Sequence, residues 1–166
     1  MTVNFSLWWQ FLHVNSLIYD ESVEFTSLVI QGIENLPCIK CVKHFNNYVK
    51  PINIVSNSKF LFNLHNSINT RTNKPMFKWQ NISTTYGNKN EEQLFDLNWK
   101  FICMIFMTSP KRHNLVKYYR ELLKFYNYDI MVDVSKLLSN QRQFYLYASY
   151  RKLGGNKTMD EIAYSS

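Results

Sequence analysis

Two closely spaced cysteines are the residues of this chain best suited to chemistry. Cys38 and Cys41 enclose two residues, and cysteines at this spacing can close a small disulfide or bind a metal ion together. Pro37 directly precedes them, and proline suits the first turn of a helix. We therefore expect both cysteines in a first helical turn, where the positive end of the helix dipole stabilises a thiolate. This position favours redox chemistry.

Three other interpretations of the pair stay open from these residues alone. A thioredoxin-like motif should follow a β-strand, whereas helical spacing precedes Cys38. A second interpretation is two ordinary buried thiols, as we interpret the isolated Cys103. The third is a structural zinc site that takes two more ligands from the single, widely separated histidines, which are His13, His44, His65 and His113.

A second group of polar residues follows in the next expected helix. His65 and Asn69 are four residues apart, so they share a helix face and could together meet a polar ligand lying along it, with Asn66 next to them. Lys74 and Phe77 come shortly after. An ordinary solvated helix surface is the alternative interpretation.

Apolar residues recur at helical spacing along most of the chain and predict an all-α fold. Ser6 is expected to cap the first helix. The polar, turn-rich stretch 81–90 is expected to separate two helical layers, which gives domains at 1–80 and 91–153 before a frayed tail at 154–166. The predicted helices cover residues 7–19, 21–33, 37–49, a stretch around 60–68, 95–107, 114–126 and 134–153.

Composition excludes several classes of protein. The 166 residues are enough for a real hydrophobic core, and three cysteines are too few for the disulfide framework of a secreted mini-protein. The formal charge is +7, but lysines and arginines are scattered, so we expect a solvated basic surface and no nucleic-acid partner. The N-terminus has no basic region, and no apolar run reaches membrane-spanning length, which predicts a soluble protein without a signal peptide or membrane partner.

Several motifs occur together in one order along the first half of the chain. They are Trp9-x-x-x-His13, Pro37-Cys38-x-x-Cys41-x-x-x-Phe45-x-x-Tyr48, Leu61-x-x-x-His65-Asn66-x-x-Asn69 and Lys74-Pro75-x-Phe77. This order resembles the Erv/ALR sulfhydryl oxidase family over about residues 7–79. The chain is most similar to the divergent oxidases of large DNA viruses, especially viruses of insects and arthropods.

The resemblance implies a four-helix bundle with a short fifth helix that holds FAD with its isoalloxazine against a disulfide. Cys38 and Cys41 would be the catalytic pair, with Cys38 meeting substrate and Cys41 facing the flavin, and no metal would be needed. The residues expected to bind the cofactor are Trp9, His13, Tyr19, Phe45, His65, Asn66, Asn69, Lys74 and Phe77. The implied activity is oxidation of thiol-containing substrate proteins, with O2 reduced to H2O2. The implied protein is a homodimer of the host cytoplasm or nucleus, or of the virion.

The chain also departs from the family pattern. Asn73 stands where the family has a glycine before the lysine, and Ser6-Leu7-Trp8 replaces a glycine-arginine opening. No second Cys-x-x-Cys is present to relay electrons. The stretch around Trp99 echoes the stretch around Trp9, so the added C-terminal helices could form a degenerate second copy, with Tyr128 and Met131 in the cysteine positions. The alternative function is a zinc-stabilised helical interaction module that uses the cysteine pair as ligands.

Overall fold

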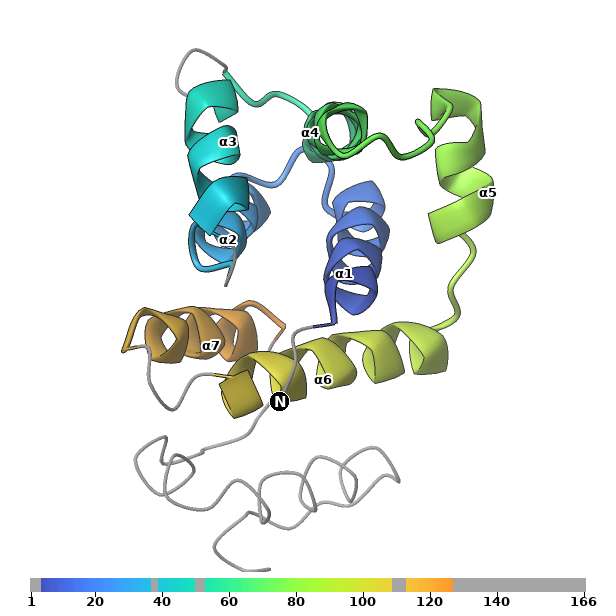
Figure 1. Ribbon diagram of the computed structural model, residues 1–166. Coiled ribbons are helices and arrows are strands. Elements are labelled where there is room, and N and C mark those ends of the chain that lie inside the picture. The colour runs from blue at the N-terminus through green and yellow to red at the C-terminus, as the bar shows by residue number, and fades with distance from the viewer. Residues whose placement is uncertain (1–3, 37–38, 50–52, 109–112, 127–166) are drawn as a thin grey trace, which may run out of the picture. The chain divides into compact units, whose positions relative to one another are not determined.

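The computed structural model describes residues 4–36, 39–49, 53–108 and 113–126, and this part of the chain is helical without strands. The predicted all-α class is confirmed. The helices are α1 (Phe5–Ile18), α2 (Val23–Glu34), α3 (Ile39–Val49), α4 (Asn57–Arg71), the 3₁₀ helix η1 (Trp79–Asn81), α5 (Ile82–Tyr86), α6 (Glu91–Thr108) and α7 (His113–Phe125) (Figure 1).

The described chain divides into two compact units. Trp8–Asn90 forms one of them, and the described residues before and after this segment are assigned to the other. In the second unit, α6 and α7 pack together, with the rings of Phe101 and Tyr118 edge to face at 6.4 Å between centroids. The residues predicted to carry chemistry, where the structure describes them, all belong to the unit Trp8–Asn90.

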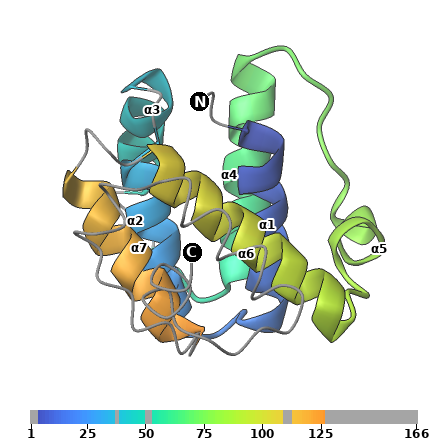
Figure 2. The same cartoon turned by 90° about the horizontal axis from the view of Figure 1, so that it is seen from below.

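Within the unit Trp8–Asn90, α1 and α4 lie side by side in the centre. Figures 1 and 2 show α2 and α3 on one side of this central pair and α5 on the other. Helices α2 and α3 contact each other, as do α3 and α4. The apolar face of each helix is buried in this arrangement, which is the packing that amphipathic helices require. The buried apolar residues of α1, α2 and α4 include Phe11, Leu12, Phe25, Leu28, Val29, Phe60, Leu61 and Leu64.

Asn57 connects the loop between α1 and α2 to the start of α4. Its side chain is buried, its amide nitrogen donates to the carbonyl oxygens of Tyr19 (2.8 Å) and Ser22 (3.1 Å), and its amide oxygen accepts from Thr26 (2.6 Å). A buried polar group is stable only when its hydrogen bonds are made, and Asn57 makes them across 31 to 38 residues of sequence. This junction sets where α4 begins relative to α1 and α2.

The N-terminal caps of α2 and α4 are serines. The hydroxyls of Ser22 and Ser56 accept hydrogen bonds from the backbone N–H groups of Phe25 and Lys59. The predicted cap of the first helix is wrong, because α1 begins at Phe5 and the side chain of Asn4 accepts from Leu7 N–H at 3.0 Å. Ser6 therefore lies inside the helix, and an earlier asparagine satisfies the free N–H group.

Residues 81–90 also differ from expectation, since part of this polar stretch folds as α5. Ile82 and Tyr86 are buried and lie four residues apart on one side of this short helix. The predicted helix 134–153 and the tail 154–166 lie outside the described residues, as do Tyr128 and Met131.

A search of the described helices finds none that combines the length and the apolar character needed to cross a bilayer.

Candidate active site

Cys41 lies in the first turn of α3, as predicted, and its sulfur is part of a disulfide. Cys38 lies outside the described residues. The side chain of Arg71, the last residue of α4, points a guanidinium nitrogen at the Cys41 sulfur at a distance of 4.0 Å. The sulfur therefore lies where the start of α3 meets the end of α4, and a permanent cation is beside it.

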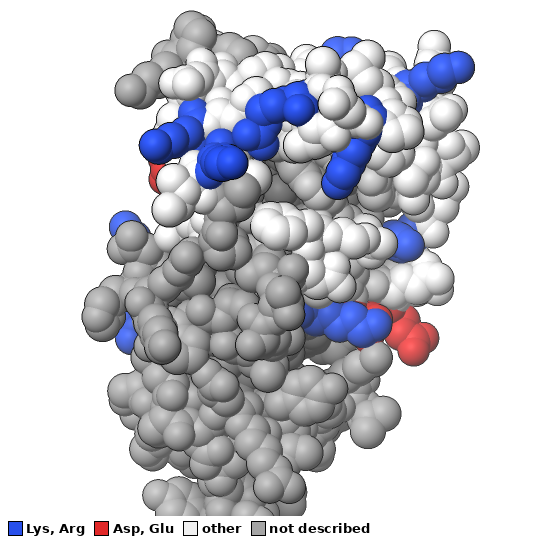
Figure 3. All heavy atoms as spheres, in the orientation of Figure 1, with Lys and Arg blue, Asp and Glu red and all other residues white. Residues whose placement is uncertain are grey.

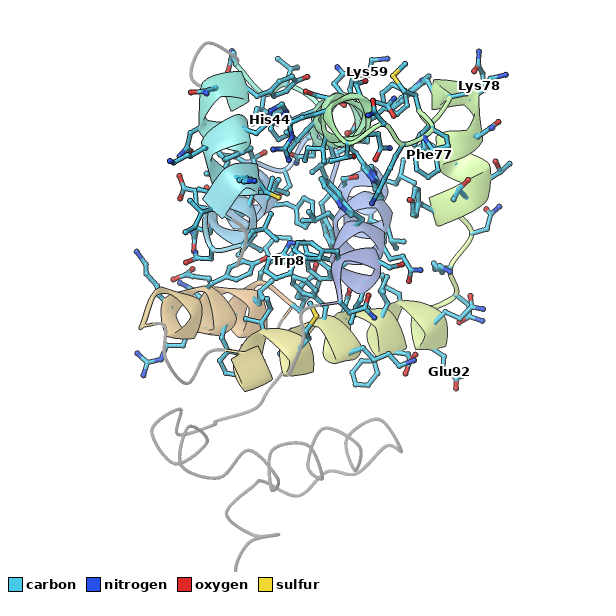
Figure 4. The ribbon with its side chains drawn as sticks, in the orientation of Figure 1. Trp8, His44, Lys59, Phe77, Lys78 and Glu92 are labelled. Carbon is cyan, nitrogen blue, oxygen red and sulfur yellow. The ribbon has the colours of Figure 1, made fainter. Side chains whose placement is uncertain are left out.

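Helices α3 and α4 contact each other in opposite directions, so that the start of α3 meets the end of α4 and the end of α3 meets the start of α4. Cys41 meets Arg71, His44 Nε2 is 2.8 Å from the Ser67 hydroxyl, and Tyr48 lies against Phe60, with 6.3 Å between ring centroids. Figure 4 shows His44 on the side of α3 that faces α4. This packing holds the first turn of α3, and with it the cysteine, against the last turn of α4.

Phe45 has a structural role in the same contact. It is 1% exposed, and its ring meets Phe60 edge to face at 6.3 Å. Phe45 lies one turn beyond Cys41, so its burial fixes the orientation of the cysteine-bearing turn. Its expected contact with a cofactor stays a prediction.

A group of planar side chains lies between α1, α4 and α5, and we refer to it as the ring cluster. The rings of Trp9 and His65 are stacked with 4.1 Å between centroids and 4° between planes. The rings of His13 and Tyr86 are stacked at 4.5 Å and 17°, and His13 Nε2 lies 2.9 Å from His65 Nδ1. Phe77 closes the group, with its ring 5.5 Å from that of His65 and 6.1 Å from that of Tyr86. Four of the five members were predicted from the sequence as cofactor-binding residues.

Asn66 holds Phe77 in place. Its amide oxygen accepts from Phe77 N–H at 2.8 Å, and its amide nitrogen donates to the Phe77 carbonyl at 3.0 Å. Asn69 donates in the same way to the carbonyl of Pro75 at 3.2 Å. The two asparagines thus bind the chain that returns from α4 toward α5, where Figure 4 shows Phe77. Sequence reasoning expected them to contact a ligand, and that contact stays a prediction.

The turn that carries Lys74 is a Schellman motif. The N–H of Lys74 donates to the carbonyl of Asn69 at 2.8 Å, and the N–H of Asn73 donates to the carbonyl of Thr70 at 3.3 Å. Asn73 has a φ of 54°, in the left-handed region that glycine and asparagine tolerate best. The replacement of the family's glycine by Asn73 therefore preserves the turn that places Lys74.

The two histidines of the ring cluster are held neutral. Burial and the neighbouring His65 lower the pKa of His13 from 6.5 to about 3, and burial and Lys74 lower the pKa of His65 to about 4. His13 Nδ1 is also buried and finds no hydrogen-bond partner in the described part of the chain. A buried ring nitrogen without a partner is costly unless a ligand or water satisfies it.

The remaining expected site residue, Tyr19, follows the end of α1. Its ring contacts Phe25 of α2 with 5.7 Å between centroids, and its carbonyl accepts from Asn57. These contacts place Tyr19 at the α1–α2 junction. A direct role in binding a cofactor stays a prediction for this residue.

Sequence reasoning missed Tyr86. The available signal was an aromatic residue in an otherwise polar stretch, four residues after Ile82. It also missed a neighbouring contact outside the ring cluster, where the Lys59 ammonium lies 4.3 Å from the ring centroid of Trp79.

Among the described residues, no group of three or more His, Cys, Asp or Glu side chains could hold a metal ion.

A helical unit that carries both a disulfide-bonded cysteine in a first helical turn and a cluster of stacked rings is typical of a helical protein of the thiol–disulfide redox class. Residues 6–87 match the model of the Erv1/Alr family, and this part of the chain belongs to that family. The sequence is 27% identical to a FAD-linked sulfhydryl oxidase of African swine fever virus (isolate Warthog/Namibia/Wart80/1980) over 90 residues, which cover 48% of this chain and 76% of the relative.

A second relative is the FAD-linked sulfhydryl oxidase of the Pig/Kenya/KEN-50/1950 isolate of the same virus. It is 27% identical over 89 residues, which cover 47% of this chain and 75% of the relative. No solved structure matches the chain. The predicted resemblance to the Erv/ALR family and to its viral members is confirmed by these matches.

Proposed function

We propose that this chain is an FAD-linked sulfhydryl oxidase that takes electrons from the thiols of substrate proteins and delivers them to O2, with H2O2 as the product. Membership of residues 6–87 in the Erv1/Alr family carries the proposal. The disulfide at Cys41 supports it, because a disulfide in the first turn of a helix is an electron acceptor for thiols.

The ring cluster and its surroundings fit FAD. Stacked flat side chains such as Trp9 and His65 suit a planar ring system, and the unpartnered Nδ1 of His13 offers a polar atom for a ligand to bond. Lys74, which ends the Schellman turn, supplies positive charge for a diphosphate. Trp9, His13, His65, Phe77 and Lys74 would hold the cofactor.

The protein's own residues would carry out the thiol exchange. A substrate thiolate attacks Cys38, the bond between Cys38 and Cys41 breaks, and Cys41 leaves as a thiolate beside the Arg71 guanidinium, which stabilises the new negative charge. A second substrate thiol then displaces Cys38, so the substrate leaves with a disulfide and the protein keeps two thiols. Bound FAD would supply the two-electron acceptor that restores the protein disulfide, and O2 would finally receive the electrons.

The test is the Cys41→Ser variant, assayed by oxygen consumption with dithiothreitol. We expect the rate to fall to background, because serine cannot form the disulfide, while the protein keeps its bound flavin. Cys103→Ser is the matched control and should retain the wild-type rate. A Cys41→Ser protein that oxidised dithiothreitol at the wild-type rate would exclude this assignment.

The alternative function is the zinc-stabilised helical module. It predicts a colourless protein that releases metal to a chelator, whereas the oxidase should purify yellow with an absorption band at about 450 nm. The expected homodimer and the place of action in host cytoplasm, nucleus or virion stay predictions.

A further inference from the structure

Acidic residues are absent from a long part of the site-bearing unit. Residues 35–90 contain eight lysines and arginines and no aspartate or glutamate. The last acidic residue before this segment is Glu34, at the end of α2. This acid-free segment is the longest in the chain, and it includes α3, α4 and α5, which carry Cys41 and part of the ring cluster.

The folded chain gathers several of these cations around the disulfide. Lys40 precedes Cys41 and Lys43 follows it by two residues in α3, and both lysines are exposed to solvent. Arg71 reaches the same sulfur from α4 at 4.0 Å, and Lys74 follows in the next turn. Figure 3 shows lysine and arginine side chains in the region where Figure 1 places α3 and α4. The first turn of α3 and the end of α4 therefore bring several positive charges to the neighbourhood of the disulfide.

These cations have no acidic partners within the described part of the protein. Lys40, Lys43, Arg71 and Lys74 make no ion pair there, whereas Lys100 of α6 is paired with Asp96 at 2.7 Å. Like charges held close together repel each other, and this repulsion lowers the stability of the folded protein. A partner of opposite charge that binds there reduces the repulsion. Exposed cations beside the disulfide attract negatively charged molecules to that bond.

We propose that the substrate thiols of this protein lie in acidic segments, whose aspartate and glutamate side chains are recognised by Lys40, Lys43 and Arg71 around Cys41. This inference rests on the proposed oxidase function and names its substrate class. An acidic protein segment is favoured over nucleic acid because the cations lie near a disulfide, and only a thiol-bearing partner has a reason to approach that bond. Complementary charge acts mainly on the rate of association, so the preference will appear in kcat/KM.

The test compares dithiol peptides that are identical except for flanking residues, which are all glutamate, all glutamine or all lysine. Oxygen consumption by the flavin-loaded full chain is followed at about 0.02 M and about 0.3 M salt, where the screening length differs several-fold. We expect kcat/KM for the glutamate peptide to exceed that for the glutamine peptide by about tenfold at low salt, with the lysine peptide slowest. High salt should reduce the difference.

The variant Lys40→Gln/Lys43→Gln/Arg71→Gln should lose most of the preference for the glutamate peptide, measured as the ratio of kcat/KM for the glutamate peptide to kcat/KM for the glutamine peptide. The matched control is Lys59→Gln/Lys78→Gln/Lys89→Gln, which removes the same charge from the same acid-free segment but away from Cys41, with Lys59 against Trp79 and Lys78 beside α5 in Figure 4. This control should keep the wild-type ratio.

Three outcomes would overturn the inference. The first is equal kcat/KM for the three peptides. The second is an equal loss of the peptide preference in the two triple variants. The third is duplex DNA that binds more tightly than the glutamate peptide to the wild type and loses this binding in the variant Lys40→Gln/Lys43→Gln/Arg71→Gln. Wild-type oxidation of dithiothreitol is measured alongside. Its absence would refute the oxidase function itself, whereas its presence with equal peptide rates would refute only the preference for acidic substrates.

Discussion

At the scale of single residues, the hydrogen bond between His13 and His65 connects α1 to α4. Their rings are 52 positions apart in sequence and share one hydrogen bond of 2.9 Å in a largely buried place. Both are neutral at pH 7, because burial opposes a charge on either ring. One ring can therefore donate the shared proton and the other can accept it, which a pair of charged imidazoles could not do.

This pair makes the stability of the flavin-free protein depend on pH. The folded-state pKa values of about 3 and about 4 lie below the ordinary 6.5, so the unfolded chain binds more protons between them. The stabilising contribution is present above pH 6.5 and is lost as the pH falls toward the folded values. We expect the free energy of unfolding in urea to fall by about 2 kcal/mol from His13 alone between pH 7 and pH 5.

The His13→Asn variant should lose part of this slope. An unchanged dependence of the free energy of unfolding on pH in this variant would show that other groups titrate.

Asp20 titrates in a separate pH range. Burial raises the pKa of its carboxyl, but hydrogen bonds from Ser58 and Ser56 outweigh burial and bring the pKa below 3.8. Its contribution is therefore present above pH 3.8 and is lost only below that value.

At the scale of elements, the end of α4 determines where the chain turns toward the ring cluster. The Schellman hydrogen bonds at Asn73 and Lys74 stop the helix after Arg71, and Asn66 and Asn69 then hold the following segment. The turn depends on a left-handed residue, which side chains branched at Cβ adopt only with strain.

Substitution of Asn73 tests this turn. Asn73→Val should lower the free energy of unfolding by about 1–2 kcal/mol, because valine resists the φ of 54°. Asn73→Gly should have little effect or stabilise slightly. Asn53→Val is the matched control, at an exposed position outside the helices and without positive φ, and should be close to neutral. Equal effects of the two valine variants, measured in urea, would contradict the assignment.

At the scale of the whole molecule, the described site residues all belong to one of the two compact units. A ligand that binds there only in the folded state will stabilise that state in proportion to its free concentration. The side chains of the ring cluster come from three helices and the segment between α4 and η1, so a ligand that contacts them holds these elements together.

FAD should therefore raise the melting temperature of the flavin-free protein. At a concentration of about a hundred times Kd, the added stability is about 2.7 kcal/mol. Riboflavin, which lacks the diphosphate and adenine, should stabilise less, since Lys74 would have no phosphate to bind. Unfolding by a chelator together with no response to FAD would instead favour the zinc module.

Several features were predictable from the sequence because they depend on local interactions. Helix α3 and the position of Cys41 in its first turn follow from proline and apolar spacing, and the start of α4 follows from the serine cluster before it. The boundaries of α1 to α4, α6 and α7 agree with the predicted ones to within a few residues. The wrong cap at Ser6 and the unexpected helix α5 within residues 81–90 concern short polar stretches, where sequence spacing distinguishes cap, turn and helix poorly.

The sequence by itself determined the family, the all-α class and the residue types available for redox chemistry, since motif order and periodicity are properties of the linear chain. Only the tertiary structure decided that Trp9 stacks on His65, that Tyr86 joins His13, and that Arg71 reaches Cys41. These contacts join residues 30 or more positions apart, and the last of them places a cation at the reacting sulfur. Helix spacing places each residue on a face of its own helix, but which faces meet depends on how the buried surfaces of all the helices pack together.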